Sequence, residues 1–197
     1  MKIDVDLLLS WGGIIKAYKK KEIIFREDSL PQYFFQIISG KIAMYNTSED
    51  GKEFYQGLFG DNESFGEPPL FIDKPYPSTA IAYKDTVVIR LPKNNFFELL
   101  QSSSELQQNF IKLFANRIYN KANASKILIV NDAEERVVEF LESFKKSAGS
   151  IKQKILVPQT RQEIANMIGL RVETVIRTLT KLQHANKVQI IDHKLYY

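Results

Sequence analysis

Side chains that do nucleophilic or metal chemistry are scarce in this chain of 197 residues. It has no cysteine, which excludes thiol nucleophiles, thiolate zinc sites and cysteine-bound iron–sulfur clusters. Its two histidines, His184 and His193, lie in the last 14 residues, so the rest of the chain offers no imidazole to a metal, a haem or a catalytic pair. We therefore expect no enzyme, no metal site and no cofactor. A metal-dependent enzyme of the cupin type would need histidines inside its barrel.

The chemistry that the chain does offer is charge recognition, concentrated near the C-terminus. The formal net charge is +4. Residues 151–197 hold eight Lys/Arg and three Asp/Glu, whereas residues 1–150 hold 19 and 20. An excess of positive charge in one segment favours a module that binds a polyanion such as nucleic acid.

Within that segment, the spacing of a few residues predicts a helix-turn-helix. Thr160 and Glu163 form the Ser/Thr-x-x-Glu pattern of a capping box, which predicts a helix over 161–168. Gly169 follows where the turn needs a positive φ, and a second helix is predicted from about 172 to 184. The predicted core of the pair consists of Ile164, Ala165, Ile168, Val175, Leu179 and Leu182.

Short β-rich runs flank these two helices. A strand is predicted at 155–157, and the runs at 188–191 and 194–197 predict a hairpin, the wing of a winged helix. The second helix carries the polar residues that a helix in the major groove needs, namely Arg171, Thr174, Arg177 and Lys181. The capping box, the turn, the hairpin and the positive charge together predict a DNA-binding module.

Residues 22–100 have a different character, with short β-rich runs separated by turn residues. The runs are 23–25, 33–38, 41–45, 54–59, 78–83 and 86–91. Several short strands at this spacing are typical of an antiparallel sandwich or barrel.

Two helical segments are expected to flank the strands. Residues 1–20 are predicted to form a short helical segment in which Trp11 packs on the core. After the last run, Asn94 or Asn95 is expected to cap a short helix that ends at Leu100.

A long helix is predicted next, at about 104–130, because no proline or glycine interrupts it. At 1.5 Å per residue it would be roughly 37 Å long, too long for one small barrel to cover. A second copy of the chain in a parallel dimer is therefore expected to bury its apolar stripe, the alternative being packing within one chain. The residues expected at the dimer interface are Phe110, Ile111, Phe114, Ala115, Ile118, Ala122, Ser125 and Ile129.

Asn131 and Asp132 are interpreted as a hinge after this helix. Asp132 is expected to cap a further helix over 133–146. The predicted domains are therefore 1–131 and 132–197.

Two stretches of the chain resemble a known family of bacterial transcription regulators. Gly60–Glu67 with Pro77–Ala80 is similar to the effector cassette of the Crp/Fnr family, which includes the cyclic-AMP receptor protein and the fumarate-nitrate-reduction regulator. Pro158–Arg177 is similar to the helix-turn-helix of that family. The resemblance covers nearly the whole chain. It implies an α+β fold with an N-terminal antiparallel β-roll of the cupin-like, cyclic-nucleotide-binding type, a long dimerisation helix and a C-terminal winged helix-turn-helix.

The effector cassette departs from the pattern of cyclic-nucleotide-binding members. In those members a glutamate takes the ribose hydroxyl and an arginine takes the cyclic phosphate. Glu67 matches the glutamate, but Pro77 stands in the place of the arginine and offers neither a charge nor an N–H. The resemblance therefore implies an effector other than cyclic AMP, or none, and Glu67 could instead cap local backbone amides. The residues expected around an effector are Phe65, Glu67, Tyr76, Ser78 and Thr79.

Base recognition is assigned chiefly to Glu173 and Arg177, which lie four residues apart on one helix face. The carboxylate can accept from a cytosine amino group, and the guanidinium can bind guanine O6 and N7. Val172 before Glu173 resembles the fumarate-nitrate-reduction branch, which implies TTGA-like half-sites in an inverted repeat. Ile176 departs from the serine of that branch. The residues expected at the DNA are Thr160, Arg161, Gln162, Arg171, Val172, Glu173, Thr174, Ile176, Arg177, Lys181 and Lys194.

The expected function is a homodimeric, sequence-specific transcription regulator that binds double-stranded DNA and works with RNA polymerase. The alternative is a cyclic-nucleotide-binding sensor whose C-terminal domain binds a protein partner. No apolar run approaches the roughly 18–20 residues that cross a bilayer, and the first residues lack the apolar core of a signal peptide. We therefore expect a cytoplasmic protein without a membrane partner.

Overall fold

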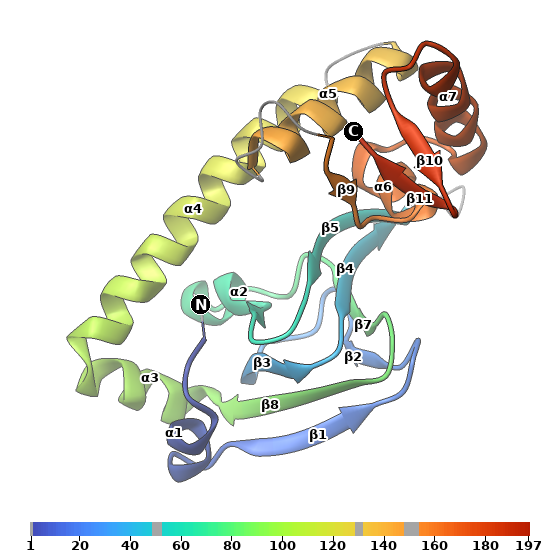
Figure 1. The fold of residues 1–197 in the computed structure, drawn as a ribbon. Helices are drawn as coiled ribbons and strands as arrows, with labels where there is room; N and C mark the ends of the chain where they lie inside the picture. Colours follow the sequence, from blue (N-terminus) through green and yellow to red (C-terminus); the bar gives the residue numbers. More distant parts are fainter. Residues whose placement is uncertain (1, 49–52, 129–131, 148–153) are drawn as a thin grey trace. The chain divides into compact units, whose positions relative to one another are not determined.

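The computed structural model describes residues 2–48, 53–128, 132–147 and 154–197 (Figure 1). The chain divides into two compact units, Met1–Arg117 and Ile118–Tyr197. The long helix α4 (Ser104–Leu128) begins in the first unit and ends in the second. Among the described residues, no helix is long and apolar enough to cross a membrane.

The N-terminal unit is built around two antiparallel sheets of four strands each, in the orders β1-β8-β3-β6 and β2-β7-β4-β5. All six predicted strands are present, which confirms the antiparallel fold class. The strands are β1 (Ile14–Tyr18), β2 (Ile23–Phe25), β3 (Tyr33–Ser39), β4 (Ile42–Thr47), β5 (Glu53–Phe59), β6 (Ser64–Phe65), β7 (Thr79–Ala82) and β8 (Thr86–Pro92).

Alternation along β8 shows how the two cores of this unit form. Val88 belongs to the cluster between the two sheets, together with Phe35 and Met44. Its neighbours Ile89 and Leu91 point to the other face, because side chains alternate along a strand. That second face is covered by α1 (Val5–Ser10), α2 (Glu67–Ile72), α3 (Lys93–Ser102) and the start of α4.

The structure corrects the prediction for the first 20 residues. Only Val5–Ser10 is helical, and Ile14–Tyr18 forms β1, which pairs with β8 from Ile14↔Arg90 to Tyr18↔Thr86. β1 is an end strand of its sheet, and the exposed fractions of Ile14 and Ile15 are 48% and 49%. Trp11 packs against the apolar cluster beneath the helices, as expected.

One further local prediction was wrong. Neither Asn94 nor Asn95 caps α3: Pro92 holds the N-cap position without a side-chain bond, and Asn95 Nδ2 donates to the Trp11 carbonyl at 2.8 Å. Helix α2 accommodates the two prolines that follow Glu67, because prolines in the first turn of a helix sacrifice no intrahelical hydrogen bond.

The C-terminal unit has the predicted winged-helix elements. They are α5 (Ala133–Ser147), β9 (Leu156–Val157), α6 (Arg161–Ile168), α7 (Val172–His184), β10 (Gln189–Ile191) and β11 (Lys194–Tyr196). Asp132 Oδ1 accepts from the Glu135 amide at 2.8 Å and so caps α5. The strands form one sheet in the order β10-β11-β9. All six predicted core residues of the helix pair are buried.

Candidate nucleic-acid interface and sensor site

The first helix of the motif begins at a complete capping box. Thr160 Oγ1 accepts from the Glu163 amide at 3.1 Å, and Glu163 Oε2 accepts from the Thr160 amide at 2.6 Å. The hydroxyl oxygen of Thr160 therefore accepts a hydrogen bond within the helix. The backbone amides of the first turn are the donors that α6 can offer to an anion.

The turn between α6 and α7 depends on Gly169. Its φ is 67°, in the left-handed region, and its amide bonds the Ala165 carbonyl. A residue without a Cβ enters this region at no steric cost, which is why the glycine could be recognised from the sequence. The turn brings Ile164 and Ile168 of α6 against Val175 and Leu179 of α7.

The outer face of α7 presents Glu173, Ile176 and Arg177, all of which are exposed. Val175, Leu179 and Leu182 occupy the opposite, buried face. No ion pair joins Glu173 to Arg177 in the structure, although the two lie four residues apart on the helix. Both charged groups are therefore free to meet a base edge.

Two predicted DNA residues lie elsewhere on α7. Val172 is half-buried against the core of the C-terminal unit, because the helix begins at this residue and its side chain packs inward. Lys181 Nζ forms an ion pair with Glu134 Oε2 of α5 at 2.5 Å. The hydrogen bond to that carboxylate raises the pKa of Lys181. The ammonium is thus directed toward α5.

Arg161 links the first helix to the wing. Its Nη1 donates to the carbonyl oxygen of His193 at 2.6 Å. His193 and Asp192 form the turn between β10 and β11, with φ values of 62° and 47°. Two consecutive residues with positive φ are typical of a tight hairpin turn. Arg161 therefore holds the wing turn beside the start of α6. The exposed Lys194 follows that turn directly in the chain.

In the N-terminal unit, the cassette glutamate is neutralised within the chain. The side chain of Glu67 is 0% exposed, and its Oε2 accepts from Arg117 Nη1 of α4 at 2.7 Å. Arg117 Nη2 also donates to the Ser64 carbonyl at 2.6 Å. No residue of the cassette indicates this pairing in the sequence, because Arg117 lies 50 residues after Glu67.

Buried polar atoms without a partner gather in the cassette. They are Ser64 Oγ, Glu67 Oε1, Tyr76 Oη and Ser78 Oγ. Burial and, secondarily, the charge of Glu67 raise the pKa of Tyr76, so its phenol stays protonated. Buried polar groups are normally satisfied by protein or water, so these atoms can bond to small polar molecules.

Aromatic rings fill the space beside these atoms. The rings of Phe25 and Tyr76 stack with centroids 3.6 Å apart, and Phe25 also lies 6.1 Å from Phe65. Gly66 has a φ of 74°, and a Cβ at this position would approach the Phe25 ring to 2.9 Å. The rings thus occupy the interior next to Glu67.

Four of the five predicted effector residues line this buried region, and one does not. Phe65, Glu67, Tyr76 and Ser78 are all buried. Thr79 instead bonds the Glu27 amide through Oγ1 at 3.1 Å. Pro77 is held by Asn46 Nδ2, which donates to its carbonyl at 2.7 Å. Neither Pro77 nor its neighbour Ser78 supplies a cation for a phosphate.

Helix α4 carries an exposed apolar stripe. The exposed fractions of Ile111 and Ile118 are 67% and 70%, and Ala115, Ala122 and Ser125 are exposed on the same stripe. Ile129 lies outside the described residues.

Two residues of the predicted dimer interface lie elsewhere. Phe110 is buried, and Phe114 packs against the same cluster beneath the helices of the N-terminal unit. The rings of Phe110 and Phe34 meet edge to face with centroids 6.0 Å apart. These two residues therefore pack within their own chain.

Comparisons with known proteins agree with this arrangement. The cyclic nucleotide-binding domain family matches residues 15–103, and the Crp-like helix-turn-helix domain family matches residues 135–195. The chain is 27% identical to the transcriptional activator protein FnrA of Stutzerimonas stutzeri, over 90% of this chain and 76% of the relative. It is also 27% identical to the cyclic AMP receptor protein of Thermus thermophilus, over 95% and 84%.

The fold is shared with solved structures. FixK2 from Bradyrhizobium japonicum superposes with a TM-score of 0.74 at 21% identity, covering 93% of this chain and 91% of that one. Several curated relatives are named as transcriptional activators or regulatory proteins. The β-roll, the long helix and the winged helix-turn-helix, matched by both family domains in this order, show that the chain belongs to the Crp/Fnr family of transcription regulators and binds DNA through its C-terminal unit.

Proposed function

We propose that this regulator binds an inverted repeat of TTGA-like half-sites as a homodimer, in the cytoplasm and together with RNA polymerase. The observation that carries the proposal is the outer face of α7, where Glu173, Ile176 and Arg177 are exposed and unpaired above a buried face. Side chains at this spacing lie on one side of a helix and reach neighbouring base pairs in a major groove.

The proposed base contacts follow from the chemistry of these three residues. Arg177 donates to O6 and N7 of a guanine, and Glu173 accepts from a cytosine amino group. Ile176, which is 50% exposed, offers an apolar contact to a thymine methyl group. Together they suit a half-site that contains both a G·C pair and thymines.

The other polar residues predicted at the DNA are assigned to phosphates or, for Arg171, Thr174 and Lys181, to phosphates or secondary base contacts. The first-turn amides of α6, with Gln162, lie at a helix N-terminus, which attracts anions. Arg161 is assigned to the DNA through the wing turn, whose His193 carbonyl it holds. Arg171 and Lys194 are exposed cations, and Thr174 is half-buried near the start of α7. Lys181 contributes a phosphate contact only after its pair with Glu134 opens.

Dimerisation is assigned to the exposed stripe of α4. The stripe consists of Ile111, Ala115, Ile118 and Ala122, which follow one another at spacings of four, three and four residues. This repeat favours a parallel coiled coil, and covering it would remove large apolar side chains from water. The predicted domains 1–131 and 132–197 stay part of this proposal; Asn131 of the predicted hinge lies outside the described residues.

The effector, if the chain uses one, is proposed to be something other than a cyclic nucleotide. The cassette holds an anion, Glu67, whose one cationic partner is already Arg117, and no arginine takes the phosphate position. The unpaired atoms of Ser64, Tyr76 and Ser78 suit a small, uncharged polar molecule.

Selection from random double-stranded DNA tests this function. We expect enrichment of a palindrome with TTGA-like halves, and binding that weakens steeply as salt increases. A different palindrome would contradict the half-site alone. No enrichment, with no salt-dependent binding, would contradict the DNA-binding proposal and favour a protein partner for the C-terminal unit.

A further inference from the structure

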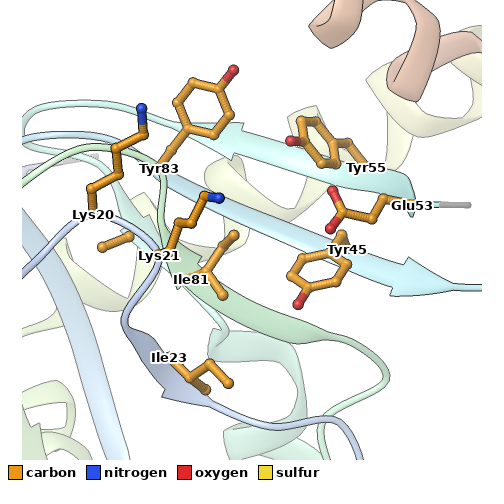
Figure 2. A pocket seen from close by; sticks show the side chains of 9 residues that line it. Lys20, Lys21, Ile23, Tyr45, Glu53, Tyr55, Ile81 and Tyr83 are labelled. Carbon is orange, nitrogen blue, oxygen red and sulfur yellow. The ribbon is translucent and has the colours of Figure 1, made fainter. Parts of the chain in front are cut away.

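A pocket of about 490 Å³ lies in the N-terminal unit, on the β2-β7-β4-β5 sheet (Figure 2). Its side chains include Tyr45 and Ile81, which alternate with the inward-facing Met44 and Ala80 along β4 and β7. Because side chains alternate across a strand, the pocket lies on the face opposite to the aromatic interior of the roll. It is therefore separate from the effector cassette around Glu67.

Charges of opposite sign line two sides of this pocket. Figure 2 shows Lys20 and Lys21 on one side and Glu53 on the other, with its carboxylate directed toward the lysines. None of the three forms an ion pair with a residue that the structure describes. The remaining lining is apolar and aromatic: Ile23, Tyr45, Tyr55, Ile81 and Tyr83, together with Ala82, which also belongs to the interior cluster.

The lysine side of the pocket is held in place by its backbone. The Lys20 amide donates to Asp85 Oδ1 at 2.9 Å, and the Lys21 amide donates to the Ala82 carbonyl at 2.7 Å. Lys21 has a φ of 70°, a conformation that a residue with a Cβ seldom adopts outside well-determined turns. Two ammonium groups are thus carried on a turn that is tied to the edge of the pocket.

The tyrosines of the pocket contribute a neutral hydrogen-bond donor, Tyr45, and two rings that pack against each other. Tyr55 and Tyr83 meet edge to face with centroids 6.3 Å apart. Burial and the nearby Glu53 carboxylate raise the pKa of Tyr45, so its hydroxyl remains a donor at neutral pH. The volume falls in the range of pockets that take small molecules.

From this arrangement we propose that the pocket binds a small zwitterion whose two charges are separated by an apolar body, of the class of apolar di- and tripeptides. The carboxylate of such a ligand would meet Lys20 and Lys21, and its ammonium group would meet Glu53. Ile23 and Ile81 would contact the apolar side chains. A phosphate ester fits less well, because Glu53 would repel it.

Chemical-shift titration of the full chain with the dipeptide Leu-Phe tests this site. We expect saturable shifts at the amides of Lys21 and Tyr83, with a dissociation constant on the order of 1 mM. The matched probes are N-acetyl-Leu-Phe, which lacks the cation, and Leu-Phe amide, which lacks the anion. Removing either charge should raise the dissociation constant about threefold to fivefold, as expected for exposed ion pairs.

Variants assign each end of the ligand to its side of the pocket. In Glu53→Gln, Leu-Phe should bind no better than its N-acetyl form. In the double variant Lys20→Gln and Lys21→Gln, it should bind no better than its amide. Lys74→Gln and Glu98→Gln change exposed residues outside the pocket. Both variants should still bind Leu-Phe more tightly than its N-acetyl form and its amide.

Three outcomes would overturn the proposal. The first is that no saturable shift is seen up to about 10 mM Leu-Phe. The second is that the unmodified chain binds the blocked and the free dipeptides equally. The third is that the pocket variants still prefer free Leu-Phe to its blocked forms as strongly as the unmodified chain does. None of them bears on DNA binding, which uses the other unit.

Discussion

Arg117 of α4 donates to a carboxylate oxygen of Glu67 that is wholly buried, and its second amino group bonds the Ser64 carbonyl at 2.6 Å. The pair joins the cassette of the roll to the long helix that continues into the second unit. Since the other oxygen of Glu67 has no partner, Arg117 is the group that compensates its charge.

Removing Arg117 should therefore destabilise the N-terminal unit. We expect Arg117→Ala to lower the free energy of unfolding by about 3–5 kcal/mol, because it leaves a buried carboxylate without a counter-charge. Adding Glu67→Gln to Arg117→Ala should recover part of this loss, since the charge is then gone. Denaturant unfolding of both variants measures the difference. Equal stability of the unmodified chain and Arg117→Ala would contradict the role of the pair.

Cyclic nucleotides should not bind the cassette. Glu67 is already paired, Pro77 offers no cation, and the rings of Phe25 and Tyr76 stack beside them. We expect titration calorimetry with cyclic AMP and with cyclic GMP to show no binding. Micromolar affinity for either nucleotide would show that the interior opens and that another group takes the phosphate.

The stripe on α4 should set the oligomeric state. Ile118→Glu would place two charges in the seam of a parallel pair, which should raise the dissociation constant of the dimer at least about tenfold. Sedimentation at several concentrations measures this change. Leu30→Glu is the matched control, since Leu30 is also an exposed apolar residue, at 67%, but lies far from α4 in the sequence. If Ile118→Glu sediments as a dimer with normal DNA affinity, the interface lies elsewhere.

Arg177 should read one base pair. We expect Arg177→Ala to cost about 1–3 kcal/mol on the preferred half-site and to relax selection at a single position. Lys187→Ala, at another exposed basic residue after α7, should leave the sequence preference intact. A uniform loss on all sequences would instead make Arg177 a phosphate contact.

Arg161 should act on DNA through the wing. Lys194→Ala should weaken binding to all sequences alike and reduce the salt slope by about 0.9, as the loss of one phosphate contact does. If Arg161 serves to hold the His193 carbonyl, Arg161→Ala should give a similar loss, and the double variant should lose little more than either. Additive losses, with twice the change in slope, would mean that Arg161 contacts a phosphate of its own.

The two units differed in how much the sequence could predict. α6 and α7 were predicted with their observed bounds, because Thr160, Glu163 and Gly169 act on residues three to five positions away. The strand Ile14–Tyr18 was not predicted, because its partner β8 lies some 70 residues later and no local pattern indicates the pairing. Arg117 was missed for the same reason: its carboxylate partner is 50 residues away in the chain.

The end strand β1 combines exposed apolar residues with a charge at the edge of its sheet. Ile14 and Ile15 stand exposed on a strand with one unpaired edge among the described residues, a combination that invites strand addition and aggregation. Lys16 follows them directly, with its ammonium 4.6 Å from the centroid of the Tyr18 ring. A charge in that place repels the same residue of an approaching copy. Lys16 therefore places on β1 the kind of edge charge that disfavours strand addition by a second copy.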